Sequence, residues 1–394
     1  MLRHPWQRVT LAMFAVGWGA NQFAPMLVVY RDELGLSAQT RSLLFGIYAV
    51  GLIPGLLIGG TASDRWGRRA VTVPFVLLSP LATLLLVLLR HDTVGLGAAR
   101  LLVGVCSGVV FGAASAWVAE LSTGEAEGTG ARRAAVALSA GFGTGPLVAG
   151  LVGEWAPHPL WVPYLPHIVL GTVAAALLLS APEPPGVRRG AGPLIRIPLV
   201  TRTRRFLTAV APVAPWVFGC AAISVAFLPG EIGGGTSGAV AFAGITTGVT
   251  LGTGVLIQPL ARRMDDRRAL SGGVAGLLFA LAGTGVGILA LTLDSRAVVL
   301  LGAPLLGAGY GFCLVSGLRE TERLSAPDER GATVSIFYAL TYLGFAVPYL
   351  LGLLSSLGTG ERGALVVTAG VAVACLLVVS AALRRPSPAP AAGP

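Results

Sequence analysis

Long apolar runs, separated by short polar segments, repeat from one end of the chain to the other. Each run is about 20 residues long, which lets a helix cross roughly 30 Å of hydrocarbon. The pattern therefore predicts an all-α integral membrane protein with twelve transmembrane helices. The predicted spans are residues 9–30, 42–63, 71–90, 94–119, 133–153, 161–181, 206–229, 239–261, 270–292, 296–318, 332–354 and 363–383.

Composition supports this interpretation. Charged residues make up 12% of the chain, whereas soluble domains have about 25%. The net charge is +10, every basic residue other than histidine is an arginine, and the arginines form short clusters between apolar runs. This distribution indicates membrane orientation, and we expect no nucleic-acid binding. The four cysteines lack C-x-x-C spacing, so we expect no metal site, and we expect no cofactor.

The arginines also predict which way the chain crosses the membrane. Most of them fall in the segments on the same side as the N-terminus. By the positive-inside rule, both termini of this multi-pass protein of the cell (inner or plasma) membrane are then cytoplasmic. Arg3 and Arg8 precede the first apolar run as in a signal peptide, but the run is long and another span follows directly, so we expect a retained span.

A polar segment divides the spans into six plus six. Residues 183–205 are rich in proline, glycine and arginine, and we expect a cytoplasmic linker on an anionic membrane surface. The predicted units are therefore an N-terminal six-helix bundle at 1–182 and a C-terminal six-helix bundle at 206–384. We expect the tail, 385–394, to be disordered.

The two halves of the chain look related. The arginine pair at 68–69 matches the pair at 267–268 with an offset of 199 residues, and Glu120 matches Glu320 with an offset of 200. Two anchors that agree indicate an internal duplication. Duplicated membrane halves place the substrate site between them, near the midplane.

Three motifs carry a family resemblance. Residues 60–69 read GTASDRWGRR between spans 2 and 3, residues 96–108 follow L-x-x-x-R-x-x-x-G-x-x-x-G, and residues 141–150 read GFGTGPLVAG in span 5. Together they resemble the major facilitator superfamily, and the span 5 motif is similar to that of its twelve-span drug:proton antiporters. The resemblance implies two pseudo-symmetric six-helix bundles that alternate in access. We expect a monomer that binds a small-molecule substrate within the lipid bilayer.

The motif between spans 2 and 3 contains Asp64, an acidic residue that the orientation of the chain in the membrane does not explain. A carboxylate at a helix end is stabilised by a neighbouring helix N-terminus and by arginines. The resemblance implies that this loop locks the halves in the outward-open state, with Asp64 near Gly331. In the alternative interpretation, its arginines only anchor the loop in the cytoplasm. Arg263 stands opposite Asp64 in the second copy, so we expect a one-sided latch. The latch candidates are Gly60, Asp64, Arg65, Gly67, Arg68 and Arg69.

Arg100 lies inside span 4. A charged side chain at this depth should face the interior and have partners, and Asn21 and Gln22 in span 1 lie at a comparable depth. The alternative is an arginine that snorkels to the surface. In span 5, small residues and a proline predict a helix that packs closely and bends, although ordinary close packing is the alternative. These residues are Gly141, Gly145, Pro146 and Gly150.

Uncharged polar and aromatic side chains within the spans are the candidates for a substrate cavity, because an aromatic, nearly neutral cavity suits an amphipathic organic molecule. Core packing or contact with lipid is the alternative for each of them. The candidates are Trp18, Asn21, Gln22, Tyr48, Trp216, Tyr310, Tyr338 and Tyr342.

No predicted span has a carboxylate in its interior that could bind a coupling proton. All carboxylates fall at span ends or in loops, and span 1 has Asn21 where many drug:proton antiporters carry an acid. Protons are nevertheless the expected coupling ion, because the span 5 motif resembles that of proton antiporters. The candidates for coupling are Arg100, Asp32, Glu154 and His167, the last being a titratable histidine near the start of span 6.

These observations predict a secondary transporter that exports small amphipathic compounds, a drug or metabolite efflux protein that works by proton antiport. Uptake or facilitated transport of a neutral metabolite is the alternative within transport. A non-transporting sensor should add a soluble domain, and no loop is long enough for one. The four histidines show no ligand spacing or paired acid, so we expect no enzyme activity and assign no catalytic residue.

Overall fold

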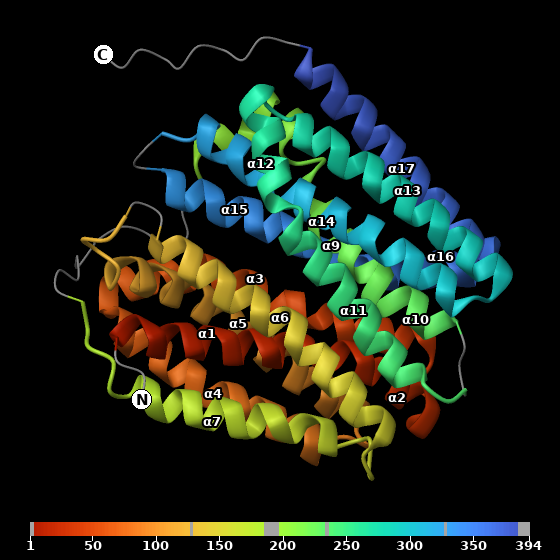
Figure 1. Cartoon of the computed structure of the whole chain (residues 1–394), viewed down its shortest axis with the longest axis horizontal. Coiled ribbons are helices and arrows are strands. Elements are labelled where there is room, and N and C mark those ends of the chain that lie inside the picture. Colours follow the sequence, from red (N-terminus) through yellow and green to blue (C-terminus); the bar gives the residue numbers. More distant parts are fainter. Residues whose placement is uncertain (1–3, 127–128, 185–196, 233–235, 327–328, 385–394) are drawn as a thin grey trace.

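The computed structural model describes residues 4–126, 129–184, 197–232, 236–326 and 329–384 (Figure 1). These residues form helices and contain no β-strand. Ten helical stretches among them are long and apolar enough to cross a membrane, and Val162–Leu178 is a shorter apolar one. The stretch Arg330–Leu383 is interrupted at Gly358, whose φ of +102° is not helical, so it supplies two segments. The prediction of an all-α membrane fold is confirmed.

The helices fall into two groups along the chain. The first half contains α1 (Pro5–Asn21), α2 (Phe23–Leu34), α3 (Ala38–Trp66), α4 (Arg68–Leu88), α5 (Thr93–Glu120), α6 (Thr129–Trp155), η1 (Val162–Tyr164) and α7 (Leu165–Leu178). The second half contains η2 (Leu199–Arg202), α8 (Arg204–Ala209), α9 (Ala214–Ala222), η3 (Ile223–Phe227), α10 (Leu228–Glu231), α11 (Ala239–Leu256), α12 (Gln258–Arg267), α13 (Ser271–Leu293), α14 (Arg296–Leu324), α15 (Arg330–Tyr342), η4 (Leu343–Ala346), α16 (Val347–Leu354), η5 (Ser355–Thr359) and α17 (Gly360–Leu383).

Prolines account for breaks within the predicted spans. α1 ends at Asn21, four residues before Pro25, because proline has no N–H to bond the carbonyl of the preceding turn. Pro348 follows the 3₁₀ turn η4 in the same way, and Pro229 follows the π-helical turn η3. Within helices, π-helical turns are frequent at functional sites, and 3₁₀ stretches often mark hinges.

Glycines let pairs of helices touch through their backbones. A Cβ atom at Gly104 or Gly108 of α5 would collide with backbone oxygens of α3. Gly307 and Gly311 of α14 lie 203 residues further along, and a Cβ atom there would collide with backbone oxygens of α11. Small residues permit this close approach in membrane helices. The repeated contact supports the internal duplication.

The helices of each half pack mainly on one another, and Figure 1 shows the red-to-yellow half below the green-to-blue half. Contacts between the halves come from α11 with α6 and α2, and from α3 with α15 and α16. We call the face where α3 ends the Asp64 face, and the face where α3 begins the Glu231 face. Within the predicted linker, residues 185–196 lie outside the described residues, as does the predicted tail, 385–394.

Candidate functional site

The loop at the Asp64 face is a tight turn between two helices. α3 ends at Trp66 and α4 begins at Arg68, with Gly67 between them at a φ of +104°, a conformation that side chains other than glycine rarely adopt. Asp64 pairs with Arg68 at 2.5 Å, and Arg68 also pairs with Glu120 of α5 at 2.7 Å. The motif therefore ties α3, α4 and α5 together.

Glu183 is a further partner of this loop. Its carboxylate accepts the backbone N–H groups of Arg68 at 2.6 Å and Arg69 at 2.8 Å. A carboxylate at a helix N-terminus satisfies free donors and complements the helix dipole. Arg69 also donates to the carbonyl of Leu179 at 2.6 Å. No sequence pattern indicates this contact, because Glu183 is more than 110 residues away in the predicted linker.

The second copy of this loop differs from its predicted alignment. α3 ends at Trp66 and α12 at Arg267, so an offset of 201 residues sets Asp265, not Arg263, opposite Asp64. Asp265 is buried and accepts the N–H of Gly272 at 2.9 Å. The paired arginines were a misleading anchor because the turns after the two helices differ in length.

The residues predicted to form a latch differ in their surroundings. The Asp64 side chain is 54% exposed and pairs within its own loop. A Cβ atom at Gly331, the expected neighbour of the latch, would have open space around it, as would one at Gly60. Arg65 is half-buried in the last turn of α3.

Arg100 is buried between helices of the first half, with 1% of its surface exposed. Its guanidinium donates to the carbonyls of Leu44 and Ala20, both at 3.2 Å. It also lies over the rings of Phe23, at 4.1 Å, and Tyr48, at 4.9 Å. The side chain faces the interior and does not snorkel. Its acceptors are backbone carbonyls of α1 and α3 and not the side chains of Asn21 and Gln22.

Gln22 belongs to a different buried network. Its side-chain amide donates to Thr83 of α4 at 3.4 Å, and Thr83 bonds Nδ1 of His167 at 2.8 Å. All three side chains are buried, and Nε2 of His167 has no hydrogen-bond partner. The network joins the break between α1 and α2 to α4 and α7. Asn21 is only half-buried, at the end of α1.

The glycine-proline motif lets α6 pack against α1 of its own half and against α11 of the other half. Gly141 and Gly145 lie on the backbone of α1, and a Cβ atom at Gly145 would be 2.6 Å from the Trp18 carbonyl oxygen. A Cβ atom at Gly150 would be 2.7 Å from the Cα of Gly244 in α11. Pro146 is buried within α6. The motif therefore forms part of the contact between the halves.

Two coupling candidates lie at the Glu231 face. Glu154 accepts the N–H groups of Gly238 at 2.5 Å and Val240 at 3.0 Å, and so caps α11 of the other half. Asp32 pairs with Arg31 at 2.8 Å, and Arg31 donates to the carbonyl of Gly230 in the other half at 2.7 Å. These bonds hold the halves together at this face.

Three substrate candidates come together in one aromatic cluster between the halves. It consists of Phe45, Tyr48, Phe218, Tyr310, Tyr342 and Phe345. Phe345 of η4 is central, because it contacts Phe45 and Tyr48 of the first half at 5.0 and 5.5 Å between ring centroids. It also contacts Phe218 of α9 at 5.1 Å. Offset aromatic contacts of this kind stabilise a pair beyond the area that they bury.

The remaining candidates lie elsewhere. Trp18 contacts Phe14 on α1, and its buried indole N–H has no partner. Tyr338 contacts Phe337, and Trp216 is buried on α9, two residues before Phe218. Sequence reasoning missed the phenylalanines of the cluster, because a phenylalanine has no polar group to distinguish it from ordinary core.

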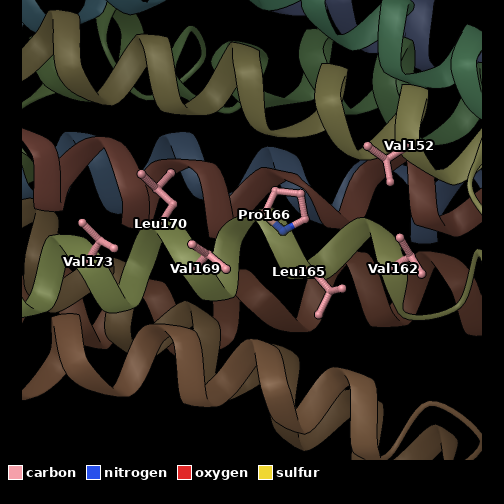
Figure 2. A pocket seen from close by; sticks show the side chains of 7 residues that line it. All are labelled: Val152, Val162, Leu165, Pro166, Val169, Leu170 and Val173. Atoms are coloured by element: carbon pink, nitrogen blue, oxygen red, sulfur yellow. The ribbon is translucent and has the colours of Figure 1, made fainter.

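An apolar groove of about 560 Å³ lies along α7. Figure 2 shows its aliphatic lining, with Val152 contributed by α6 and the other side chains by η1 and α7. Val169 is 64% exposed and Val173 49%, so the groove is on the outer surface of the helical bundle. It offers hydrocarbon contact and no polar side chain to orient a substrate.

Comparison with known proteins decides the family. The model of the Major Facilitator Superfamily matches residues 9–318. This chain belongs to that superfamily. A curated relative, the inner membrane transport protein YnfM of Escherichia coli (strain K12), is 38% identical over 82 residues, and the match spans only 20% of the length of each chain. The protein is a multi-pass membrane transporter of the superfamily.

Solved transporters share its fold over nearly the whole chain. A POT family transporter in complex with 5-aminolevulinic acid has a TM-score of 0.76 and 14% identity, covering 96% of each chain. The nucleoside transporter NupG has a TM-score of 0.75 and 13% identity, covering 97% of this chain and 100% of that one. A bacterial homolog of human Spinster, inward-facing and unoccupied, has a TM-score of 0.73 and 17% identity, covering 98% of each. Such identities indicate a shared fold alone.

Proposed function

We propose that this transporter exports small amphipathic organic compounds by proton antiport. The observation that supports the proposal is the aromatic cluster between the halves, which offers flat apolar rings and the hydroxyl groups of Tyr48, Tyr310 and Tyr342. Once the halves separate, rings of this kind suit a molecule with a large apolar surface and few polar groups. A cluster without carboxylates favours neutral compounds and delocalised cations.

The arrangement of the halves suggests how access alternates. Phe345 contacts both halves, so the substrate would have to separate its ring from Phe45 and Tyr48 to pass toward the Glu231 face. We propose that the Asp64 face is cytoplasmic, as the arginine distribution predicts. The bonds of Glu154 and Arg31 at the Glu231 face then close the outer side, and the Asp64 loop is the latch used in the opposite state.

Four residues remain the proposed coupling group. Arg100 and His167 are buried within the first half, where a change of charge would alter the packing of several helices. Asp32 and Glu154 are at the Glu231 face, where a change of charge would weaken its bonds. A proton taken up at either place would bias the equilibrium between the two access states.

Transport in proteoliposomes tests the proposal. We would measure accumulation of ethidium, a flat organic cation, and of a neutral dye of similar size, with the lumen more acidic than the bath. Proton antiport predicts accumulation that a protonophore abolishes and that liposomes without protein lack. Tyr342→Phe keeps the ring and Tyr342→Ala removes it, so Y342A should reduce transport more. If neither compound moves faster with the gradient than without it, the proposal is wrong.

A further inference from the structure

A small polar pocket lies at the Glu231 face, where the two halves meet. Its volume is about 240 Å³. The start of α3 forms one wall, and α10, η5 and the start of α17 form the others. Its lining includes Ser37, Gln39, Phe227, Glu231, Ser356 and Glu361. The side chains of Gln39 and Glu361 are exposed, so the pocket is reached from the solution at this face.

Two carboxylates of the second half line this pocket, and an arginine of the first half lies beside one of them. Glu361 lines the same small pocket as Glu231, so the two carboxylates face one volume. Arg41 of α3 has 7% of its side chain exposed, and its guanidinium lies 3.9 Å from the Glu231 carboxylate, which has 16% exposed. That distance is too long for a hydrogen bond, and the Nε atom of Arg41 has no partner. The arginine is therefore buried, and not all of its hydrogen-bond donors have acceptors.

The charges around the pocket do not cancel. Arg31 and Asp32 of α2 pair with each other at 2.8 Å, and their charges offset one another. Arg41 offsets one of the two carboxylates, so one negative charge remains. A carboxylate that is largely shielded from water beside a second negative charge resists ionisation. A single proton on Glu231 would remove the excess charge and its repulsion with Glu361.

We propose that Glu231, beside the negative charge of Glu361, binds one proton from the solution at the Glu231 face, and that this proton stabilises the closed contact between the halves. When the halves separate, α3 withdraws with Arg41 and water enters the pocket. Glu231 then ionises and the proton returns to the same solution. Closure therefore takes up one proton, and acid favours the closed state.

This proton differs from the proton of antiport. It enters and leaves on the same face, so it regulates closure and does not cross the membrane. The inference rests on the alternating access of the proposed function, but it does not depend on which ion drives transport. One linked proton can change the ratio of closed to open molecules by up to about tenfold per pH unit between the proton affinities of the two states.

Distance measurements between spin labels test the proposal without any substrate. The labels would be placed on Thr93→Cys in α5 and Thr292→Cys in α13, which are exposed residues at the Glu231 face in different halves. The full chain, with its native cysteines replaced, would be reconstituted in lipid nanodiscs and measured by electron–electron double resonance from pH 5 to 8. We expect the short-distance, closed population to rise several-fold as the pH falls.

Three variants decide which groups are responsible. Glu231→Gln mimics the protonated residue and Glu361→Gln removes the neighbouring negative charge, so each should stay closed at pH 8 and lose the pH response. Glu33→Gln removes an exposed carboxylate of α2 that does not line the pocket, and it should respond to pH as the parent does. Unchanged pH responses in both pocket variants would overturn the proposal, as would a parent protein whose distances ignore pH.

Comparison with the transport assay distinguishes a failure of this proposal from a failure of the proposed function. If the distances respond to pH as expected while transport ignores the proton gradient, then antiport is wrong and the pocket remains a proton site. If transport follows the gradient while the distances ignore pH, then antiport stands and this proposal is wrong.

Discussion

Arg100 joins three helices through one buried guanidinium group, which bonds carbonyls of α1 and α3 from its place on α5. Arg100→Ala should abolish transport and lower the free energy of unfolding by about 3 kcal/mol, because two charge-assisted hydrogen bonds are lost. Arg100→Lys keeps the charge but not the planar fork that reaches two acceptors, so we expect an intermediate loss. Thermal unfolding in detergent, transport rate and the amount of protein inserted would be measured together.

A normal transport rate in Arg100→Ala would show that the arginine has a structural role alone. Loss of insertion in the same variant would be a folding defect, and Arg100→Lys then provides the comparison at normal expression.

Asp64 offers a sharper test, because its side chain is 54% exposed and its ion pair with Arg68 contributes little to stability. Arg68 also keeps Glu120 when Asp64 is changed. Asp64→Asn should therefore leave thermal stability within about 1 kcal/mol of the parent and still reduce transport at least tenfold, if the carboxylate acts as the latch. Glu125→Gln is the matched control, since Glu125 pairs with Arg133 at 2.7 Å with similar exposure. Equal transport in the two variants would exclude the latch.

The contact of α6 with α11 depends on two glycines that face each other, Gly150 and Gly244. Gly150→Ala places a methyl group 2.7 Å from the Cα of Gly244, and such overpacking costs about 1–3 kcal/mol. We expect fewer molecules closed at the Glu231 face and slower transport, measured by the spin-label distances and by dye flux. Gly143→Ala is the control on the same helix, because its Cβ would meet open space. Similar losses in both variants would mean that general helix perturbation, not this contact, is responsible.

The helices could be predicted because each apolar run is long and its ends are marked by arginines. The breaks within these helices at η3, η4 and η5 could not be predicted. A proline or glycine in a membrane helix does not reveal whether neighbouring groups satisfy the freed backbone N–H and C=O groups. The tyrosines of the aromatic cluster were predicted as candidates because of their hydroxyl groups. Phe218 and Phe345 were not predicted, because only the folding of α9 and η4 brings them into the cluster. The Glu231–Glu361 pair was missed because the two residues are 130 positions apart.

The closed Glu231 face can also be tested by joining the halves covalently. A Cβ atom at Gly352 of α16 would lie 3.9 Å from the Cγ of Gln39 in α3. A Gln39→Cys, Gly352→Cys double variant should therefore form a disulfide under mild oxidation and stop transport, and reduction should restore it. Each single variant is the control. Continued transport with the cross-link in place would show that the halves need not separate at this face.

Glu183 links the segment between the halves to the first turn of α4, because its carboxylate holds the backbone N–H groups of Arg68 and Arg69. Helix N-terminal amides normally exchange with deuterium rapidly, since they have no partner within the helix. These two amides should therefore exchange slowly, and they should become fast in Glu183→Ala. Their exchange rates would give a label-free record of when the connecting segment leaves the Asp64 loop during the transport cycle.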